Sequence, residues 1–67
     1  MIKPSVSIII PAWNEAEHIE LTLRSLRNVP VHHFPGSIGK LEIIVVDDGS
    51  WDETYAIASL YADVMIK

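Results

Sequence analysis

Hydrophobic residues follow two kinds of pattern that alternate along this chain. Residues 6–10 and 41–46 are short, largely continuous apolar runs rich in β-branched side chains. Such runs indicate strands that are covered on both faces, as in a parallel sheet. Pro11 follows the first run and cannot donate a backbone hydrogen bond, so we expect this strand to end there.

Two further stretches have the spacing of amphipathic helices. We predict a helix over residues 14–26, with an apolar face formed by Ala16, Ile19, Leu23 and Leu26. A second helix is predicted over residues 51–62, with a buried stripe formed by Thr54, Ile57, Ala58 and Tyr61. Asn14 with Glu17, and Ser50 with Glu53, have the spacing of capping boxes and should open these helices.

The order of these elements predicts the fold class. Residues 28–40 contain two prolines and two glycines and form a loop, which is long for a helix-to-strand connection. Residues 63–67 should begin a third strand. Alternating strands and helices indicate an α/β fold with parallel strands and right-handed crossovers. We therefore predict a three-layer β-α-β-α-β fragment with strand order 3-2-1, a Rossmann-like half of a larger fold.

Composition narrows the class of protein. The chain has 67 residues, a net charge of −4 and no cysteine, so it forms one domain at most and has no disulfide. Its acidic balance argues against a nucleic-acid partner. No apolar run reaches the length of a membrane-spanning helix. We expect a soluble cytoplasmic protein, or the cytoplasmic part of a larger one that could work at the membrane face.

Candidate chemistry lies where the two predicted strands end. Residues 11–15 follow the first strand, and Asp47, Asp48, Gly49 and Ser50 follow the second. Ligands of open parallel sheets bind outside the carboxyl ends of the strands. A carboxylate there can accept hydrogen bonds from a ligand or coordinate a hard cation. Ordinary turn chemistry is an equal alternative, in which Asp47 simply bonds the backbone of the next turn.

Other classes of site fit the sequence less well. The glycine-rich loops of dinucleotide-binding and P-loop proteins are absent. An acidic pair after a parallel strand is also used by Mg²⁺-binding receiver domains, but there it normally follows the first strand. His32 and His33 are adjacent in the loop, which favours solvated histidines over metal ligands. A non-catalytic acidic module, receiver-like or an interaction domain, is therefore the alternative function.

Three stretches of the sequence together indicate a protein family more specifically than any one of them does alone. VSIIIPAWNEAEHIELTLRSL, LEIIVVDDGSWDETYAIA and YADV resemble the N-terminal part of family 2 glycosyltransferases, which have the GT-A fold. The matching motifs are Pro-Ala-aromatic-Asn-Glu after the first strand and Val-Asp-Asp-Gly-Ser after the second. The resemblance covers nearly all of the chain but only the start of a typical family domain. Residues 1–67 are thus expected to be one truncated nucleotide-sugar-binding segment.

The resemblance implies a nucleotide-sugar donor, a UDP- or GDP-sugar, and a site on this chain. By their positions in the motifs, Pro11, Ala12 and Trp13 would line the nucleobase, and Glu15 would lie near the ribose and base. Asp48 would form a hydrogen bond with the base, and Asp47 would have a more structural role. Trp13 stands where the family usually has Tyr, and Trp51 stands where Thr or Ser is commoner. The alternatives to these binding roles are that Trp13 is a core aromatic residue and that Glu15 only supplies negative charge at the start of the helix.

Parts of the family's machinery are missing from the sequence. The resemblance implies a divalent metal, Mn²⁺ or Mg²⁺, in the full-length enzyme, but its Asp-x-Asp motif is not in this chain. Asp47 and Asp48 lack the spacer of that motif. The catalytic base and the acceptor surface are absent too, so we expect the chain to be inactive alone. We also expect self-association through the exposed edge of the first strand.

Overall fold

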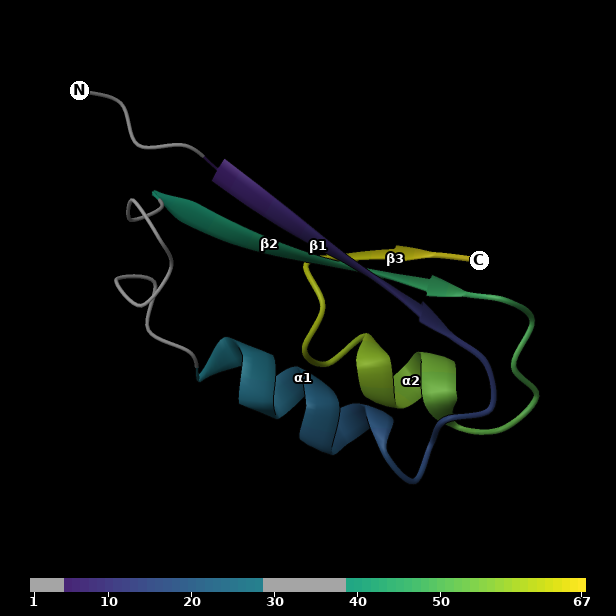
Figure 1. Ribbon diagram of the computed structural model, residues 1–67. Coiled ribbons are helices and arrows are strands. Elements are labelled where there is room, and N and C mark those ends of the chain that lie inside the picture. Colours follow the sequence, from purple (N-terminus) through teal and green to yellow (C-terminus); the bar gives the residue numbers. More distant parts are fainter. Residues whose placement is uncertain (1–4, 29–38) are drawn as a thin grey trace.

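The structure, a computed structural model, describes residues 5–28 and 39–67. The predicted loop falls mostly on residues 29–38, so that prediction and the interpretation of His32 and His33 lie outside the described residues. The elements of the described part are β1 (Ser5–Ala12), α1 (Ile19–Arg27), β2 (Lys40–Asp47), α2 (Thr54–Ala58) and β3 (Val64–Ile66), arranged as in Figure 1.

The described strands form one parallel sheet in the order β1-β2-β3. β1 and β2 pair along their whole length, from Ser5 opposite Lys40 to Ala12 opposite Asp47. β3 is short and pairs only with the C-terminal half of β2, where Val64 lies opposite Ile44. The predicted α/β fold, the parallel strands and the central position of the second strand are therefore confirmed.

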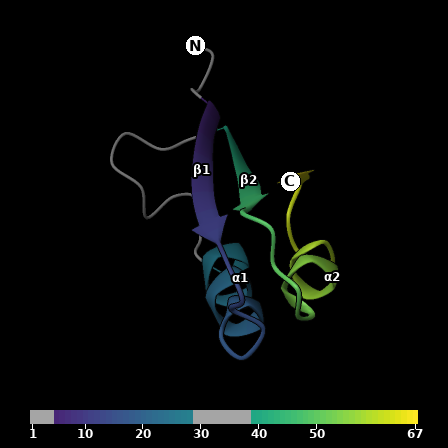
Figure 2. The same ribbon diagram turned by 90° about the vertical axis from the view of Figure 1, so that its right-hand side faces the viewer.

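Both described helices cover the same face of the sheet (Figures 1 and 2). The two crossovers step in the same direction across the sheet, and right-handed connections that do so bring their helices to one side. The described residues therefore form two layers, a sheet and a helical layer. The third layer of the predicted arrangement, on the opposite face, is not formed by them.

The core lies between the sheet and the helices. Its buried apolar residues are Ala12 of β1, Ile19 and Leu23 of α1, Ile43 and Val45 of β2, and Ala58 of α2. Alternate positions of β2 point into it, because successive side chains of a strand face opposite sides of the sheet. Of the predicted helix faces, Ile19, Leu23, Thr54 and Ala58 are buried, and Leu26, Ile57 and Tyr61 are partly buried.

The opposite face of the sheet is apolar but open. Ile9, Val64 and Ile66 are 64%, 38% and 46% exposed. Ile9 and Val64 lie on either side of Ile44 in the sheet register, so the exposed groups form one continuous surface. This explains why the strands read as nearly continuous apolar runs: toward their C-terminal ends both faces carry aliphatic side chains, whereas Ser7 and Glu42 make the other end of the open face polar.

The two predicted helix starts are wrong. α1 begins at Ile19 and has His18 as its N-cap, and α2 begins at Thr54 after Glu53. Neither N-cap residue makes a side-chain capping hydrogen bond. Asn14 and Ser50, the predicted caps, lie in the preceding loops, where they have other partners that are described with the site below.

Arg27 holds the end of α1 against the chain that leads into β3. Its Nε and Nη2 donate to the carbonyl oxygen of Tyr61 at 2.9 and 2.7 Å, and Nη2 pairs with Asp63 Oδ2 at 2.8 Å. The same Asp63 oxygen accepts the Ile43 N–H at 2.8 Å. The bond from Ile43, followed by that from Arg27, lowers the pKa of Asp63 below its ordinary value.

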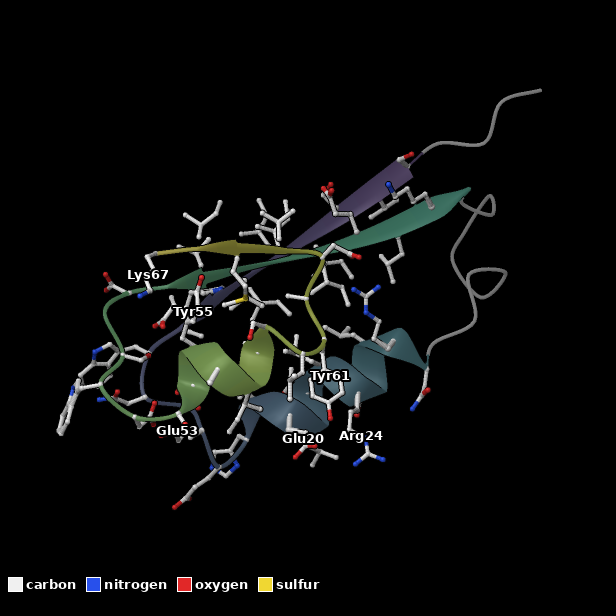
Figure 3. The ribbon with its side chains drawn as sticks, turned by 180° about the vertical axis from the view of Figure 1, so that it is seen from behind. Glu20, Arg24, Glu53, Tyr55, Tyr61 and Lys67 are labelled. Carbon is white, nitrogen blue, oxygen red and sulfur yellow. The ribbon has the colours of Figure 1, made fainter. Side chains whose placement is uncertain are left out.

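Aromatic side chains make two further contacts of this layer. The Tyr61 hydroxyl donates to Glu20 Oε1 at 2.7 Å, which joins α1 to the turn after α2 (Figure 3) and raises the pKa of Tyr61. The Lys67 ammonium lies 4.6 Å from the centre of the Tyr55 ring. These contacts lie on the surface, so each stabilises the fold only modestly.

The Asp63 contacts predict how stability responds to acid. Because the folded pKa of Asp63 is lowered, its contribution is complete above the unfolded value of about 3.9 and is lost as pH falls through the folded pKa. Asp63→Asn should therefore lower the free energy of unfolding at pH 7 and flatten its fall in acid. Urea denaturation followed by circular dichroism, at a series of pH values, measures both effects.

Glu17→Gln is the control, because it also removes one exposed carboxylate but lies outside this contact. It should keep the acid dependence of the unchanged chain. An Asp63→Asn variant with the same acid dependence as the unchanged chain would contradict the role of Asp63.

Candidate functional site

The candidate site lies at the edge of the sheet where β1 and β2 end. Ala12 and Asp47 are register partners, and the Asp48 N–H donates to the Ala12 carbonyl oxygen at 2.9 Å, one step beyond the ladder. Residues 11–15 and 47–50 are therefore neighbours, as predicted from the parallel arrangement. Figure 1 shows both segments at the end of the sheet that is remote from the N-terminus.

Asp47 and Asp48 occupy different surroundings. The Asp47 side chain is buried, and its Oδ1 accepts the Ser50 N–H at 3.0 Å. This bond closes a turn around Gly49, whose φ of +78° is a conformation that favours glycine. Asp48 is exposed. Asp47 thus has the turn role that ordinary turn chemistry anticipates, while Asp48 presents its carboxylate to solvent.

Asn14 joins the two loops of the site. Its N–H donates to Ser50 Oγ at 2.8 Å, and its Oδ1 accepts the Trp51 N–H at 3.1 Å. Its φ of +49° is left-handed, which Asn tolerates better than most residues. These bonds explain why the predicted caps fail: the Asn14 amide and the Ser50 hydroxyl bond each other's loops instead of their own helices.

Thr54 and Asp52 make a second link between the same loops. Thr54 Oγ1 accepts the Glu15 N–H at 2.7 Å and donates its proton to Asp52 Oδ1. Asp52 also accepts the Thr54 N–H at 2.9 Å and the Ala16 N–H at 3.4 Å. The bond from the Thr54 hydroxyl is the main reason that the pKa of Asp52 is lowered.

Sequence reasoning did not identify Asn14, Ser50, Asp52 and Thr54 as residues that shape the site. Their spacing did carry a signal, because short polar side chains that precede a helical stretch are hydrogen-bonding residues. For Asn14 and Ser50 the signal was assigned to helix capping within each segment, while Thr54 was assigned to the buried stripe of the second helix. The partners lie 36 to 39 residues away in the sequence, and only the pairing of β1 with β2 brings them together.

Most of the residues predicted to bind a ligand are exposed at this edge. Pro11, Trp13, Glu15 and Asp48 are exposed, whereas Ala12 and Asp47 are buried. Trp13 is 55% exposed, so it is not a core aromatic. Trp51, on the neighbouring loop, is 83% exposed, so its indole is not packed in the core either.

The described residues form an open edge without an enclosed pocket. Among them, no group of three or more His, Cys, Asp or Glu side chains is placed to hold a metal ion. The edge offers a free carboxylate at Asp48, a second acidic side chain at Glu15, and indole surface. Carboxylates accept hydrogen bonds from N–H and O–H groups, and an indole face stacks on planar or apolar ligand groups.

Neither helix of the described part combines the length and the apolar character needed to cross a membrane.

Comparison with known proteins covers both loops of the site. The sequence profile of glycosyl transferase family 2 matches residues 7–67. The chain is 44% identical over 59 residues to glycosyltransferase AglE of Haloferax volcanii, a match that covers 88% of this chain and 18% of that protein. It is 42% identical over 60 residues to the uncharacterized glycosyltransferase RP339 of Rickettsia prowazekii, covering 90% and 17%. It is 40% identical over 60 residues to the probable glycosyltransferase YdaM of Bacillus subtilis, covering 90% and 13%.

None of the solved structures matches the chain significantly. The chain spans less than a fifth of the length of these curated relatives. The matched segment nevertheless runs from β1 to the end of β3 and includes every exposed residue of the candidate site. On this evidence the chain belongs to glycosyl transferase family 2.

Proposed function

We propose that this chain supplies the nucleobase and ribose side of the donor site of a glycosyltransferase. The enzyme would transfer a hexose from a UDP- or GDP-sugar to an acceptor hydroxyl. The observation that carries the proposal is the exposed Asp48 carboxylate beside the loop that bears Trp13, at the strand ends where parallel sheets bind ligands. Family membership supports the class of reaction.

Each residue of the edge has a role that suits its surroundings. Asp48 would accept a hydrogen bond from an N–H of the base, and Trp13 would stack on the base. Glu15 would accept a hydrogen bond from a ribose hydroxyl. Pro11 and Ala12 would contact the base through their backbone, and Asp47 would hold the turn. Asp47 is suited to the structural role because it is buried and already bonded to Ser50. A planar base needs one flat wall and a few fixed polar groups, which this edge offers.

The described residues do not by themselves fit a divalent metal. One oxygen of Asp47 is committed to the Ser50 N–H, and no group of three ligating side chains is present among the described residues. We propose that the Mn²⁺ or Mg²⁺ of the complete enzyme is held by residues beyond this chain, and the proposed contacts to the base and ribose do not depend on it. Family membership also weighs against the alternative of a receiver-like or purely interacting module.

Asp48 is the residue whose substitution tests the site. Asp48→Asn keeps the shape but loses the charge. A hydrogen bond to a charged group contributes about 1.5–3 kcal/mol, against about 0.5–1.5 for a neutral one. We therefore expect about tenfold weaker binding of UDP or GDP. Asp48→Ala should lose more, because no acceptor remains. Calorimetric titration with both nucleotides, with and without Mn²⁺, measures the change.

Asp47→Asn is the matched control for this series. It should mainly lower the free energy of unfolding, since the Asp47 side chain holds the turn and is not exposed to a ligand. If Asp48→Ala keeps its affinity while circular dichroism shows an intact fold, Asp48 does not bind the nucleotide, and ordinary turn chemistry is enough to explain residues 47–50.

Another prediction concerns catalysis by the chain alone. We expect no sugar transfer, because the sequence has no Asp-x-Asp metal motif and the family resemblance implies that the catalytic base and the acceptor surface lie outside the matched segment. The assay uses radiolabelled UDP- and GDP-sugars with several acceptors, and a complete family enzyme as positive control. Transfer by a pure sample of the chain would refute this expectation.

A further prediction concerns self-association of the chain. β1 is an edge strand of the sheet that the described residues form, and Ile9 on it is 64% exposed, so both a strand edge and an apolar surface invite pairing. We expect oligomers by light scattering, and fewer of them for Ile9→Lys. Leu21→Lys adds the same charge at a 71% exposed position of α1 and should leave association unchanged. A monodisperse monomer at high concentration would count against the proposal.

A further inference from the structure

The proposed function leaves one prominent residue of the site unused. The chain has two tryptophans, and both lie in the loops that form the candidate site. Trp13 is 55% exposed and has a role in the proposed function, whereas Trp51 is 83% exposed and has none. A large apolar side chain left in water at a ligand site needs an explanation, because indole surface is favourably buried when a partner covers it.

Trp51 stands apart from the other exposed apolar residues. Ile9, Val64 and Ile66 belong to the open sheet face, and Leu21 and Leu60 belong to α1 and the turn after α2. Trp51 lies in the loop between β2 and α2, three positions after Asp48. It is therefore part of the strand-end edge and not of the surface proposed to self-associate.

The backbone of Trp51 is fixed relative to Trp13 through one residue. Asn14 Oδ1 accepts the Trp51 N–H at 3.1 Å, and Asn14 follows Trp13 directly in the chain. The Asn14 N–H bonds Ser50, the neighbour of Trp51, at 2.8 Å. Asn14 thus connects the two residues with exposed indoles: Trp13 is its neighbour in the chain, and Trp51 is its hydrogen-bond partner on the adjacent loop. That adjacent loop also carries the exposed Asp48.

We propose that Trp51 is a second aromatic contact for the base of the donor nucleotide, in addition to Trp13. The inference rests on the proposed function. An open edge with one aromatic wall covers one face of a planar base and leaves the other in water. A second indole on the adjoining loop can cover remaining base surface, and base–aromatic stacking tolerates any base because every base has a π-face.

The two tryptophans allow each contact to be followed separately. Trp13→Phe leaves Trp51 as the only indole of the chain, and Trp51→Phe leaves Trp13. We expect UDP and GDP, added up to millimolar concentration, to quench the fluorescence of both variants with the same saturating dependence. N-acetyl-tryptophanamide titrated in parallel corrects for absorbance and collisional quenching.

Affinity gives an independent readout. Trp51→Ala should bind UDP and GDP about tenfold more weakly, the loss expected for removing one base–aromatic stack. Trp51→Phe should recover most of the affinity because the flat surface is kept. Leu60→Ala is the matched control, since Leu60 is 76% exposed but lies after α2, away from the edge. It should bind as the unchanged chain does.

The outcomes separate this inference from the function on which it rests. If Trp13 fluorescence responds and Asp48→Ala weakens binding, but Trp51 neither responds nor alters affinity, the inference fails and the proposed function stands. If neither tryptophan responds and no nucleotide binds, both fail. If Trp51→Ala loses affinity and Trp51→Phe regains it, with the fold intact by circular dichroism, the inference holds.

Discussion

The hydrogen bonds of Asn14 to Ser50 and Trp51 are the interaction on which the candidate site depends. They join the loop after β1 to the loop after β2, and the link from Glu15 to Thr54 repeats the connection one residue further on. The strand ends alone would bring the loops to one edge, but not hold them in a single arrangement. With both links made, an exposed carboxylate and two indole-bearing residues share one hydrogen-bonded scaffold.

This scaffold is built at the expense of the helices. The polar residues that could have capped α1 and α2 bond the opposite loop, so both helices begin later than their apolar spacing suggests. A cap stabilises a helix start by about 1 kcal/mol. Here the polar groups of Asn14 and Ser50 form hydrogen bonds between the two loops instead of capping the helices. The helices are therefore shorter, and the loops are joined to each other.

The two faces of the sheet have different surroundings. Its covered face makes the core with both helices, while its open face carries exposed aliphatic side chains from β1 and β3. A small chain gains limited stability from one covered face. The open face is consistent with the proposed self-association, and it is distinct from the strand-end edge where the nucleotide is proposed to bind.

The sequence by itself determined the element order, the parallel sheet with a central β2, and the edge on which Asp47 and Asp48 lie. Those features follow from local patterns: apolar runs mark strands, helical spacing marks helices, and right-handed crossovers leave few ways to connect them. The resemblance of the Pro-Ala-Trp-Asn-Glu and Val-Asp-Asp-Gly-Ser stretches identified the family as well.

Only the tertiary structure decided how the polar residues of the loops are used. Local spacing cannot distinguish Asn14 as a helix cap from Asn14 as a bridge to Trp51, because the competing partner lies 37 residues away. Burial depends on the tertiary structure too: Asp47 lies on the same face of β2 as the buried Ile43 and Val45, and only the packing of the helices on that face buries it, while Asp48 beyond the strand end is exposed. Contacts between residues far apart in the sequence decide which hydrogen bonds form and which side chains are buried, and a pattern of neighbouring residues does not reveal such contacts.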